Sequence, residues 1–439
     1  MTNVFFSGSI DCMNTEFTIQ GGTRLNGEIS IPGNKNATTP LLAASLLIQD
    51  TVVLDNVPRI ADVQNMIRLL QTMHVKIDWT AENQLTINTT DADITQLDED
   101  LVKSMRSSVL FLGPLLSRFH SVTLPEPGGC TLGNRPLGTH YVALQQLGAA
   151  VNVKKTCVEI SAKKLKASEI ILPEFSVTAT ENAIMAAVLL SGKTIIKGAA
   201  IEPHVQELIS FLNDAGAKIE LKPQHRIEIT GVKKLHSVSH RIAGDPNEFA
   251  ALAVLGALAA DKIVIHGVRP DHNEMVMLKL ADIGVNFTVS QPNKNNEVSV
   301  TITKSSKKYK AVDIQALPFP GFPTDAQSPF TVLATQAEGT SLIHDPLYES
   351  RLIHVPDLIK MGAEATVCDP HRVMITGPTP LVGQNIKSFN IRAGATLMIA
   401  GIIAKGETVI CDGDIIDRGY QELDQRLNAL GAKISREES

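Results

Sequence analysis

The sequence repeats one pattern six times, in which a helix ends in a short turn and a β-strand follows directly. The turn lies around His74 in LLQTMHVKID, and the other five copies place it at Gly148, Gly216, Gly284, Gly362 and Gly431. Successive copies are about 70 residues apart, which is longer than the repeats of common solenoids. This regularity predicts a fold built from six copies of one supersecondary unit.

Each copy contains the same order of elements. A long apolar helix and a β-branched strand precede the helix end, as in ATTPLLAASLLIQDTVVL (37–54) and NEFAALAVLGALAADKIVIHG (247–267). These long helices are apolar on most faces, which indicates that they are buried. A pair of short strands with a glycine-containing turn comes first, as in FTIQGGTRLNGEISI (17–31). The unit is therefore predicted to be β-β-α-β-α-β, and the fold class to be α/β.

The six units are expected to gather into two lobes of three, because one unit alone has only a small core. At 439 residues the chain also exceeds what a single hydrophobic core usually supports. We expect the first lobe over residues 36–245 and the second over residues 16–35 plus 246–439. Residues 1–15 are expected to form a disordered extension.

Composition limits the partners of the protein. The net charge of −6, from 40 basic and 46 acidic residues, argues against the broad positive field that nucleic acid or an anionic membrane requires. No apolar run approaches the roughly 20 residues that span a bilayer, and the first residues lack the pattern of a secretory leader. The five cysteines show no metal-ligand spacing. We therefore expect a soluble, cytoplasmic protein without a metal site, in which any anion site is local.

The first residues of the buried helices are unusually polar. Helix capping is one interpretation of Asn36, Thr180, Asn247 and Asp325. Capping does not explain the three cations at helix starts, since a positive charge there opposes the helix dipole. These cations are Lys35, Arg106 and Arg392. An external anion bound at the helix starts would resolve the conflict, and if the two lobes face each other these groups would line one cleft.

The second unit contains a loop, PEPGGCTLGNRP, that the other units lack. Cys130 lies in this loop five residues before Arg135, and a guanidinium nearby favours the reactive thiolate. A packed loop cysteine is the alternative. Arg351 and Arg418 lie at strand-to-helix links of the fifth and sixth units, where a surface salt bridge is the ordinary interpretation. Taken together, the arginines suit a substrate that carries phosphate and carboxylate groups.

From about residue 17 to 434, the chain resembles the UDP-N-acetylglucosamine 1-carboxyvinyltransferases, a family of enolpyruvyl transferases. The matching segments are GNKNA, VKSMRSS, PGGCTLGNRP, FPTDAQ, ESRLIHVPDL and DRGY. The resemblance implies a two-lobed inside-out α/β barrel. It also implies transfer of the enolpyruvyl group of phosphoenolpyruvate to the 3-hydroxyl of UDP-N-acetylglucosamine, the first step of peptidoglycan precursor synthesis, without a cofactor or metal.

The resemblance also implies roles for individual residues. Cys130 would be the loop cysteine that acts as general acid or in product release and that the antibiotic fosfomycin modifies. Asp325 would be the base near the sugar 3-hydroxyl or the group that orients the intermediate. The residues implied to hold phosphoenolpyruvate are Lys35, Arg135 and Arg418. Those implied to contact the sugar nucleotide or other anionic charge are Asn36, Arg106, Pro136, Leu137, Ser176, Val177, Thr178, Leu347, Arg351 and Arg392.

Three positions depart from the family pattern. Gly138 stands where an aspartate usually lies near the uracil base. Thr178 replaces a commoner glycine in the segment that cradles the diphosphate, and Asn390 replaces an aspartate. Two alternatives therefore stay open: an enolpyruvyl transferase with a different nucleotide-sugar acceptor, and a non-catalytic binding protein of the same fold.

Overall fold

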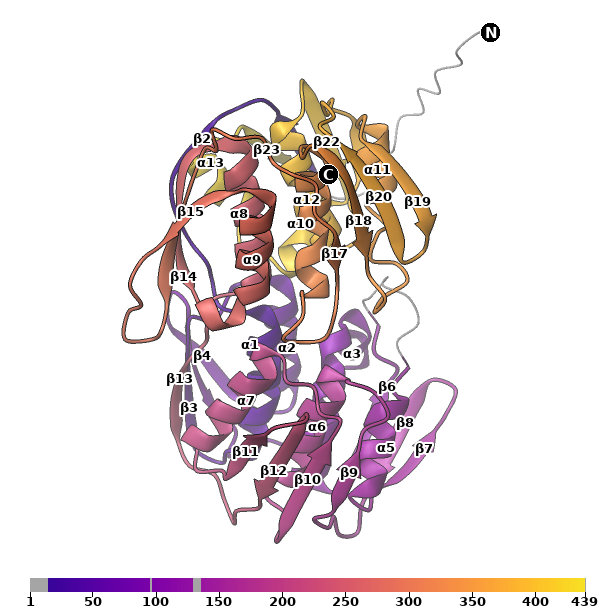
Figure 1. Cartoon of the computed structure of the whole chain (residues 1–439). Helices are drawn as coiled ribbons and strands as arrows, with labels where there is room; N and C mark the ends of the chain where they lie inside the picture. Colours follow the sequence, from indigo (N-terminus) through magenta and orange to yellow (C-terminus); the bar gives the residue numbers. More distant parts are fainter. Residues whose placement is uncertain (1–14, 95–96, 129–135, 439) are drawn as a thin grey trace. The chain divides into compact units, whose positions relative to one another are not determined.

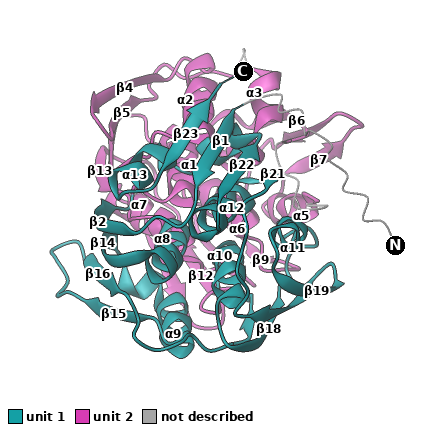
Figure 2. Ribbon diagram, turned by 90° about the horizontal axis from the view of Figure 1, so that it is seen from above, with its two compact units in different colours: residues 1–31, 246–317, 322–439 teal, residues 32–245, 318–321 magenta. Residues whose placement is uncertain are grey.

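Six small β-sheets lie in two units, three in each unit (Figures 1 and 2). The computed structural model describes residues 15–94, 97–128 and 136–438. Unit 1 comprises the described parts of Met1–Ile31, Pro246–Leu317 and Phe322–Ser439, and unit 2 comprises those of Pro32–Asp245 and Pro318–Gly321. Each unit has its own hydrophobic core.

The core of unit 2 forms around buried helices. These are α1 (Lys35–Ala44) with η1 (Ser45–Leu47), η2 (Arg106–Phe111) with α4 (Leu112–Phe119), and α6 (Val177–Ala187). The remaining helices are α2 (Ala61–Thr72), α3 (Glu99–Ser104), α5 (Gly138–Gln146) and α7 (Pro203–Asp214). All but the first residues of α1 and α6 are buried, which agrees with their apolar sequences.

Two of the three sheets of unit 2 share one topology. The first is β13 (Val238–Arg241), β3 (Thr51–Asp55), β5 (Gln84–Asn88) and β4 (Lys76–Ala81). The second is β6 (Ser121–Pro125), β8 (Cys157–Ser161) and β7 (Ala150–Val153), and the third is β11 (Ile219–Lys222), β12 (Arg226–Thr230), β10 (Lys193–Lys197) and β9 (Glu169–Ile171). Strands β13 and β9 pair in parallel with β3 and β10, and the other pairs are antiparallel. Among the described residues, β6 has no parallel partner, and this strand leads into the PGGC loop.

Unit 1 repeats this organisation. Its buried helices are α8 (Pro246–Ala259), α10 (Thr324–Thr335) and α12 (Ile391–Ile403). Its other helices are α9 (Glu274–Ile283), α11 (Val355–Lys360), α13 (Leu423–Ala429), η3 (Pro270–His272) and η4 (Gly413–Arg418). The alternation of buried and partly exposed helices confirms the repeat that the sequence predicts.

The three sheets of unit 1 have four strands each. Their orders are β15 (Asn286–Val289), β16 (Val298–Thr303), β14 (Ala260–Val268) and β2 (Leu25–Ser30); β17 (Ile314–Gln315), β18 (Gly339–His344), β20 (Arg372–Gly377) and β19 (Glu364–Asp369); and β21 (Asn385–Lys387), β22 (Glu407–Cys411), β1 (Glu16–Gln20) and β23 (Ile434–Glu437). Closure of each unit into a barrel stays a prediction.

All six predicted helix ends have a left-handed residue. The five glycines of the repeat have φ between 95° and 105°, and His74 has φ of 58°. A residue with positive φ after a helix lets the chain turn into the next strand, and glycine adopts it without strain.

The two ends of the Pro32–Asp245 segment are held together inside unit 2. Gly33 and Gly244 form a bridge, and the amide of Asn34 donates to the carbonyl of Ala243 at 2.8 Å. A Cβ on Gly33 would lie 1.9 Å from the carbonyl oxygen of Asn56, so only glycine fits there.

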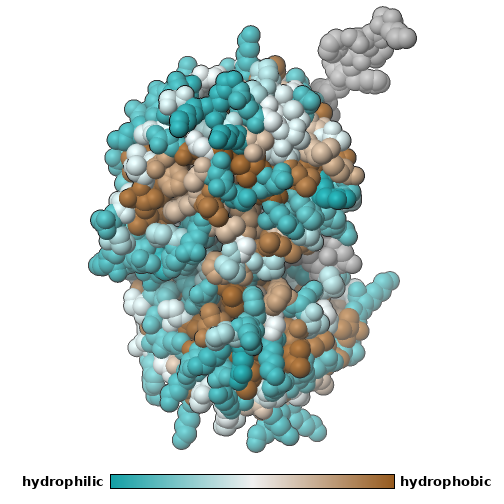
Figure 3. Space-filling model, in the orientation of Figure 1, coloured by the Kyte–Doolittle hydropathy of each residue, from teal (hydrophilic) through white to brown (hydrophobic). Residues whose placement is uncertain are grey.

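The surface mixes polar and apolar side chains. Figure 3 shows apolar patches in brown, separated by polar groups in teal, on the face that it displays. Within the described ranges, no helix combines the length and the apolar character needed to cross a lipid bilayer.

Candidate active site

In unit 1, three of the predicted site residues meet. Nη2 of Arg351 lies 2.8 Å from Oδ1 of Asp325, and Nε of Arg392 lies 3.3 Å from Oδ2 of the same carboxylate. The two arginine side chains are 3% and 6% exposed, whereas the aspartate side chain is 26% exposed. Two buried guanidinium groups therefore hold one partly exposed carboxylate. Because Asp325 pairs with these arginines and lies inside α10, helix capping is the wrong interpretation of this residue.

The start of α12 fixes the position of Arg392. The side chain of Asn390 accepts hydrogen bonds from the amides of Arg392 and Ala393, at 3.1 and 2.9 Å. Asparagine and aspartate are both favoured at this capping position. Asn390 therefore still caps α12, although the family usually has an aspartate at this position.

Asn390→Ala is expected to reduce the free energy of unfolding by about 1 kcal/mol, because two amides at the start of α12 lose their acceptor. Asn390→Asp is the matched control and should change stability by less, since aspartate caps equally well. Urea unfolding of the three proteins measures this. Equal losses for both variants would contradict the capping role.

Asp345 positions the two segments that carry Asp325 and Arg351. The sequence did not identify this residue. Its buried carboxylate accepts from the hydroxyl of Thr324, at the start of α10, and from the amides of Leu347 and Tyr348. It thus ties the helix that carries Asp325 to the loop that leads to Arg351. The only sequence signal was an Asp-Pro pair directly after a strand. Leu347 has an exposed side chain and contributes its backbone to this network.

Arg418 ends η4, which packs against the start of α12. A Cβ on Gly419 would lie 2.4 Å from Cγ2 of Ile391, so the turn approaches the helix closely. The buried ring of Tyr420 lies 5.3 Å from the guanidinium carbon of Arg392. Arg418 is partly buried. The sequence DRGY therefore places Arg418 on a turn that is packed against the Arg392 helix.

His354 lies beside the arginine cluster and is completely buried. Its Nε2 is 2.8 Å from the hydroxyl of Thr331. Burial lowers the pKa of His354 from 6.5 to about 4, and a hydrogen bond with the backbone of Arg351 opposes this shift more than the charge of Arg351 adds to it. His354 is therefore neutral at pH 7.

In unit 2, Lys35 has an internal partner. Its Nζ lies 2.7 Å from Oδ2 of Asp62, a buried residue in the first turn of α2. A carboxylate of the same unit therefore relieves the conflict between Lys35 and the helix dipole, so an external anion is not needed to explain that cation. The helix cap is Asn34, whose side chain accepts from the amide of Asn36, so capping by Asn36 is wrong.

The other polar residues at helix starts are not caps either. The hydroxyl of Thr180 donates to the carbonyl of Ser176 and accepts from the amide of Ala200. Asn247 lies inside α8 and is buried. Glu181 is buried in α6, and burial raises its pKa well above 4.5, with a further contribution from the negative charge of Glu202. Burial therefore favours the neutral form of the Glu181 carboxyl group.

Arg106 begins η2 and is partly buried. Burial raises the pKa of Tyr141 in α5, and the positive charge of Arg106 opposes this rise, so the two side chains are electrostatically coupled. A Cβ on Gly128 would lie 2.1 Å from the carbonyl oxygen of Lys103, so the PGGC loop begins against the end of α3. Cys130 and Arg135 lie outside the described residues.

The predicted nucleotide segments lie at the starts of α5 and α6, two helices that pack together. Pro136 is exposed and Leu137 is buried before α5, while Ser176 and Val177 begin α6. The hydroxyl of Thr178 lies 2.8 Å from Nε2 of His140. The departure at Thr178 is therefore accommodated by a hydrogen bond to the neighbouring helix.

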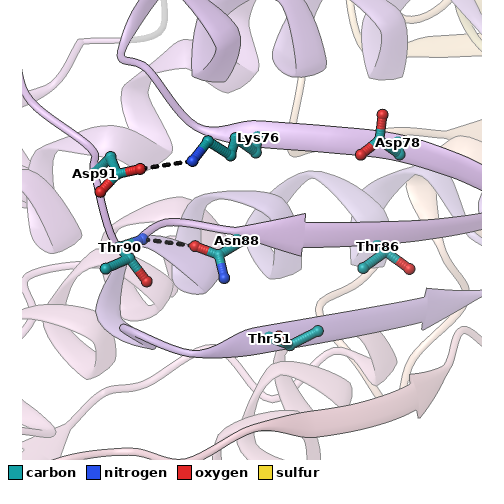
Figure 4. Close-up of a pocket in the computed structure, with 7 residues that line it drawn as sticks. All are labelled: Thr51, Lys76, Asp78, Thr86, Asn88, Thr90 and Asp91. Carbon is teal, nitrogen blue, oxygen red and sulfur yellow. Dashed lines mark hydrogen bonds and ion pairs between the residues drawn. The ribbon is translucent and has the colours of Figure 1, made fainter.

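A separate surface pocket lies on the first sheet of unit 2 (Figure 4). Its lining side chains are Thr51, Lys76, Asp78, Thr86, Asn88, Thr90 and Asp91. Lys76 pairs with Asp91 at 2.7 Å, so these two charges in the pocket neutralise each other. None of the predicted site residues lines this pocket. In the described part of the chain, no group of three or more His, Cys, Asp or Glu side chains is arranged to hold a metal ion.

The chain matches the EPSP synthase (3-phosphoshikimate 1-carboxyvinyltransferase) family over residues 19–427. It is 40% identical over 432 residues to the UDP-N-acetylglucosamine 1-carboxyvinyltransferase of Treponema denticola, which covers 96% of this chain and 99% of the relative. The protein of the same name from Bradyrhizobium diazoefficiens is 39% identical over 429 residues, covering 96% and 98%.

Two solved structures share the fold. The enolpyruvyl transferase NikO from Streptomyces tendae has a TM-score of 0.87 at 23% identity, covering 97% of this chain and 99% of its own. An EPSP synthase from Acinetobacter baumannii has a TM-score of 0.78 at 18% identity, covering 96% and 100%. At these identities the likeness concerns the fold alone, and it confirms the predicted α/β class.

Proposed function

This chain belongs to the EPSP synthase family of carboxyvinyl transferases, and from that premise we propose that it transfers the enolpyruvyl group of phosphoenolpyruvate to the 3-hydroxyl of UDP-N-acetylglucosamine and releases phosphate. The observation that carries the proposal is the 40% identity to a UDP-N-acetylglucosamine 1-carboxyvinyltransferase over 96% of this chain. The product would be the first committed precursor of peptidoglycan.

The reaction needs two proton transfers and a site for several negative charges. The oxygen of the sugar hydroxyl forms a bond to C2 of phosphoenolpyruvate while its proton leaves, and C3 gains a proton. Phosphate and one C3 proton then leave, which restores the double bond. A base, an acid and fixed cations can each lower the barrier, provided that they act more strongly on the transition state than on the substrates.

We assign the base to Asp325 and the acid to Cys130. Asp325 is supported by its partial exposure, since a carboxylate that removes a proton must be reachable by the substrate. The assignment of Cys130 rests on the PGGC motif.

The cations are proposed to bind the two substrates. Lys35, Arg135 and Arg418 would hold phosphoenolpyruvate, with Arg351 and Arg392 at its carboxylate. A charge-assisted hydrogen bond contributes about 1.5 to 3 kcal/mol. The residues proposed for the sugar nucleotide are Asn36, Arg106, Pro136, Leu137, Ser176, Val177, Thr178 and Leu347.

We propose that the enzyme acts in the cytoplasm and has no nucleic-acid or membrane partner. The net charge of −6 supports this, because it leaves no broad positive field for a polyanion.

Phosphate release from phosphoenolpyruvate is expected with UDP-N-acetylglucosamine and not with shikimate 3-phosphate. A coupled phosphate assay with both acceptors, and with other UDP-sugars beside them, measures this. Turnover only with another UDP-sugar would favour the altered-acceptor alternative, and no turnover with any acceptor would favour the non-catalytic one.

A further inference from the structure

The Asp325 carboxylate occupies a site that is built for a carboxylate. Two guanidinium groups from different elements approach its two oxygens, Arg351 from the loop before α11 and Arg392 from the first turn of α12. Guanidinium groups bind carboxylates through charge-assisted hydrogen bonds of this kind. We call the pair Arg351 and Arg392 the arginine fork.

The fork is buried, whereas the carboxylate in it is accessible. The arginine side chains are 3% and 6% exposed, and that of Asp325 is 26% exposed. The side chain of Asp325 is therefore the most accessible part of the cluster. Nε of Arg351 is also buried without a hydrogen-bond partner among the described residues, which leaves one donor of the fork for another acceptor.

The fork is held in place independently of Asp325. The carboxylate of Asp345 fixes the loop before Arg351 through the amides of Leu347 and Tyr348. The cap by Asn390 fixes the backbone of Arg392. Asp325 is the second residue of α10, so rotation of its side chain can vacate the fork while the helix stays where it is.

We propose that Asp325 is an internal stand-in for the substrate's carboxylate, which must displace it from the arginine fork. The displacement rests on the proposed function, since phosphoenolpyruvate supplies the incoming carboxylate. Two carboxylates cannot share the fork without repulsion. The exchange has a chemical consequence, because an aspartate that leaves two cations becomes a stronger base. Binding of the substrate carboxylate would thus release the base that accepts the proton of the sugar hydroxyl.

Asp325→Asn is expected to bind phospholactate about tenfold more tightly than the wild type, because the internal competitor loses its charge. Phospholactate keeps the carboxylate and phosphate of the substrate but has no double bond, so it binds without reacting. Ethyl phosphate lacks the carboxylate and should bind both proteins equally. Isothermal titration calorimetry with saturating UDP-N-acetylglucosamine measures the affinities.

Glu349→Gln is the control, because it removes an exposed acidic charge two residues before Arg351. Its affinity for phospholactate should equal that of the wild type. Asp325→Ser serves as a second variant if Asp325→Asn does not fold, as judged by its thermal unfolding.

The sign of the change decides the proposal. Equal or weaker phospholactate binding by Asp325→Asn, with normal turnover by the wild type, would overturn the displacement and leave the proposed function intact. An equal gain in affinity for ethyl phosphate would also overturn the displacement. The loss of one negative charge would then strengthen the binding of any anion. Binding of phospholactate to neither protein would count against the proposed function as well.

Discussion

Asp325→Asn is expected to lower kcat by about 10³-fold, since a positioned general base contributes 10²- to 10⁴-fold. Asparagine keeps the size of the side chain but cannot accept the proton of the sugar hydroxyl. The partners Arg351 and Arg392 stay in place, so the loss should come from chemistry more than from folding. Phosphate release at saturating concentrations of both substrates measures kcat.

The pH profile distinguishes a base from a purely structural carboxylate. In the wild type, kcat should fall at low pH as the base becomes protonated, and Asp325→Asn should lack this limb. Glu349→Gln should keep the wild-type profile. A kcat within tenfold of the wild type in Asp325→Asn would show that another group removes the proton.

Acidification from pH 6.5 to 4 is expected to lower the free energy of unfolding by up to about 3 kcal/mol through the titration of His354 alone. Burial lowers the pKa of this side chain from 6.5 to about 4. Because the folded pKa lies below the unfolded one, the unfolded chain binds more protons in this window. The stabilisation is therefore present above pH 6.5 and is lost as the pH falls towards 4.

His354→Gln isolates this contribution from those of the carboxylates. Glutamine can still bond to the hydroxyl of Thr331 but does not titrate in this range. Urea unfolding at several pH values between 7 and 4.5 should give a shallower slope of free energy against pH for the variant. Parallel slopes for the two proteins would show that His354 titrates normally.

The repeat was predictable because it depends on local sequence. The turn at His74 lacks the glycine of the other copies, yet it has the same left-handed backbone, and the spacing of the repeat located it. The apolar helices were predictable for the same reason. The three-stranded sheet that contains β6 was not predictable, because no sequence pattern distinguishes this unit's sheet from the four-stranded ones.

The partners of the charged residues could not be predicted from the sequence. Lys35 and Arg392 were expected to need an external anion, but each contacts a carboxylate that comes from another helix, Asp62 or Asp325. Such pairs depend on how helices pack, which local patterns do not encode. Asp345 was missed because a buried carboxylate that binds backbone amides has no distinctive spacing. Cys130 remains a prediction from its motif.

The order of strands in the last sheet of unit 1 has a consequence for biosynthesis. Strand β1 pairs on one side with β22 and on the other with β23, where Glu16 lies opposite Glu437. At about 5 to 20 residues per second, the ribosome completes β23 roughly 20 to 80 seconds after β1. The whole of Pro32–Asp245 emerges in the interval and can fold first, while Phe17 and Ile19 wait for their partners. The first strand of the described residues is thus among the last to be paired, and its apolar side chains lack their strand partners until synthesis is nearly complete.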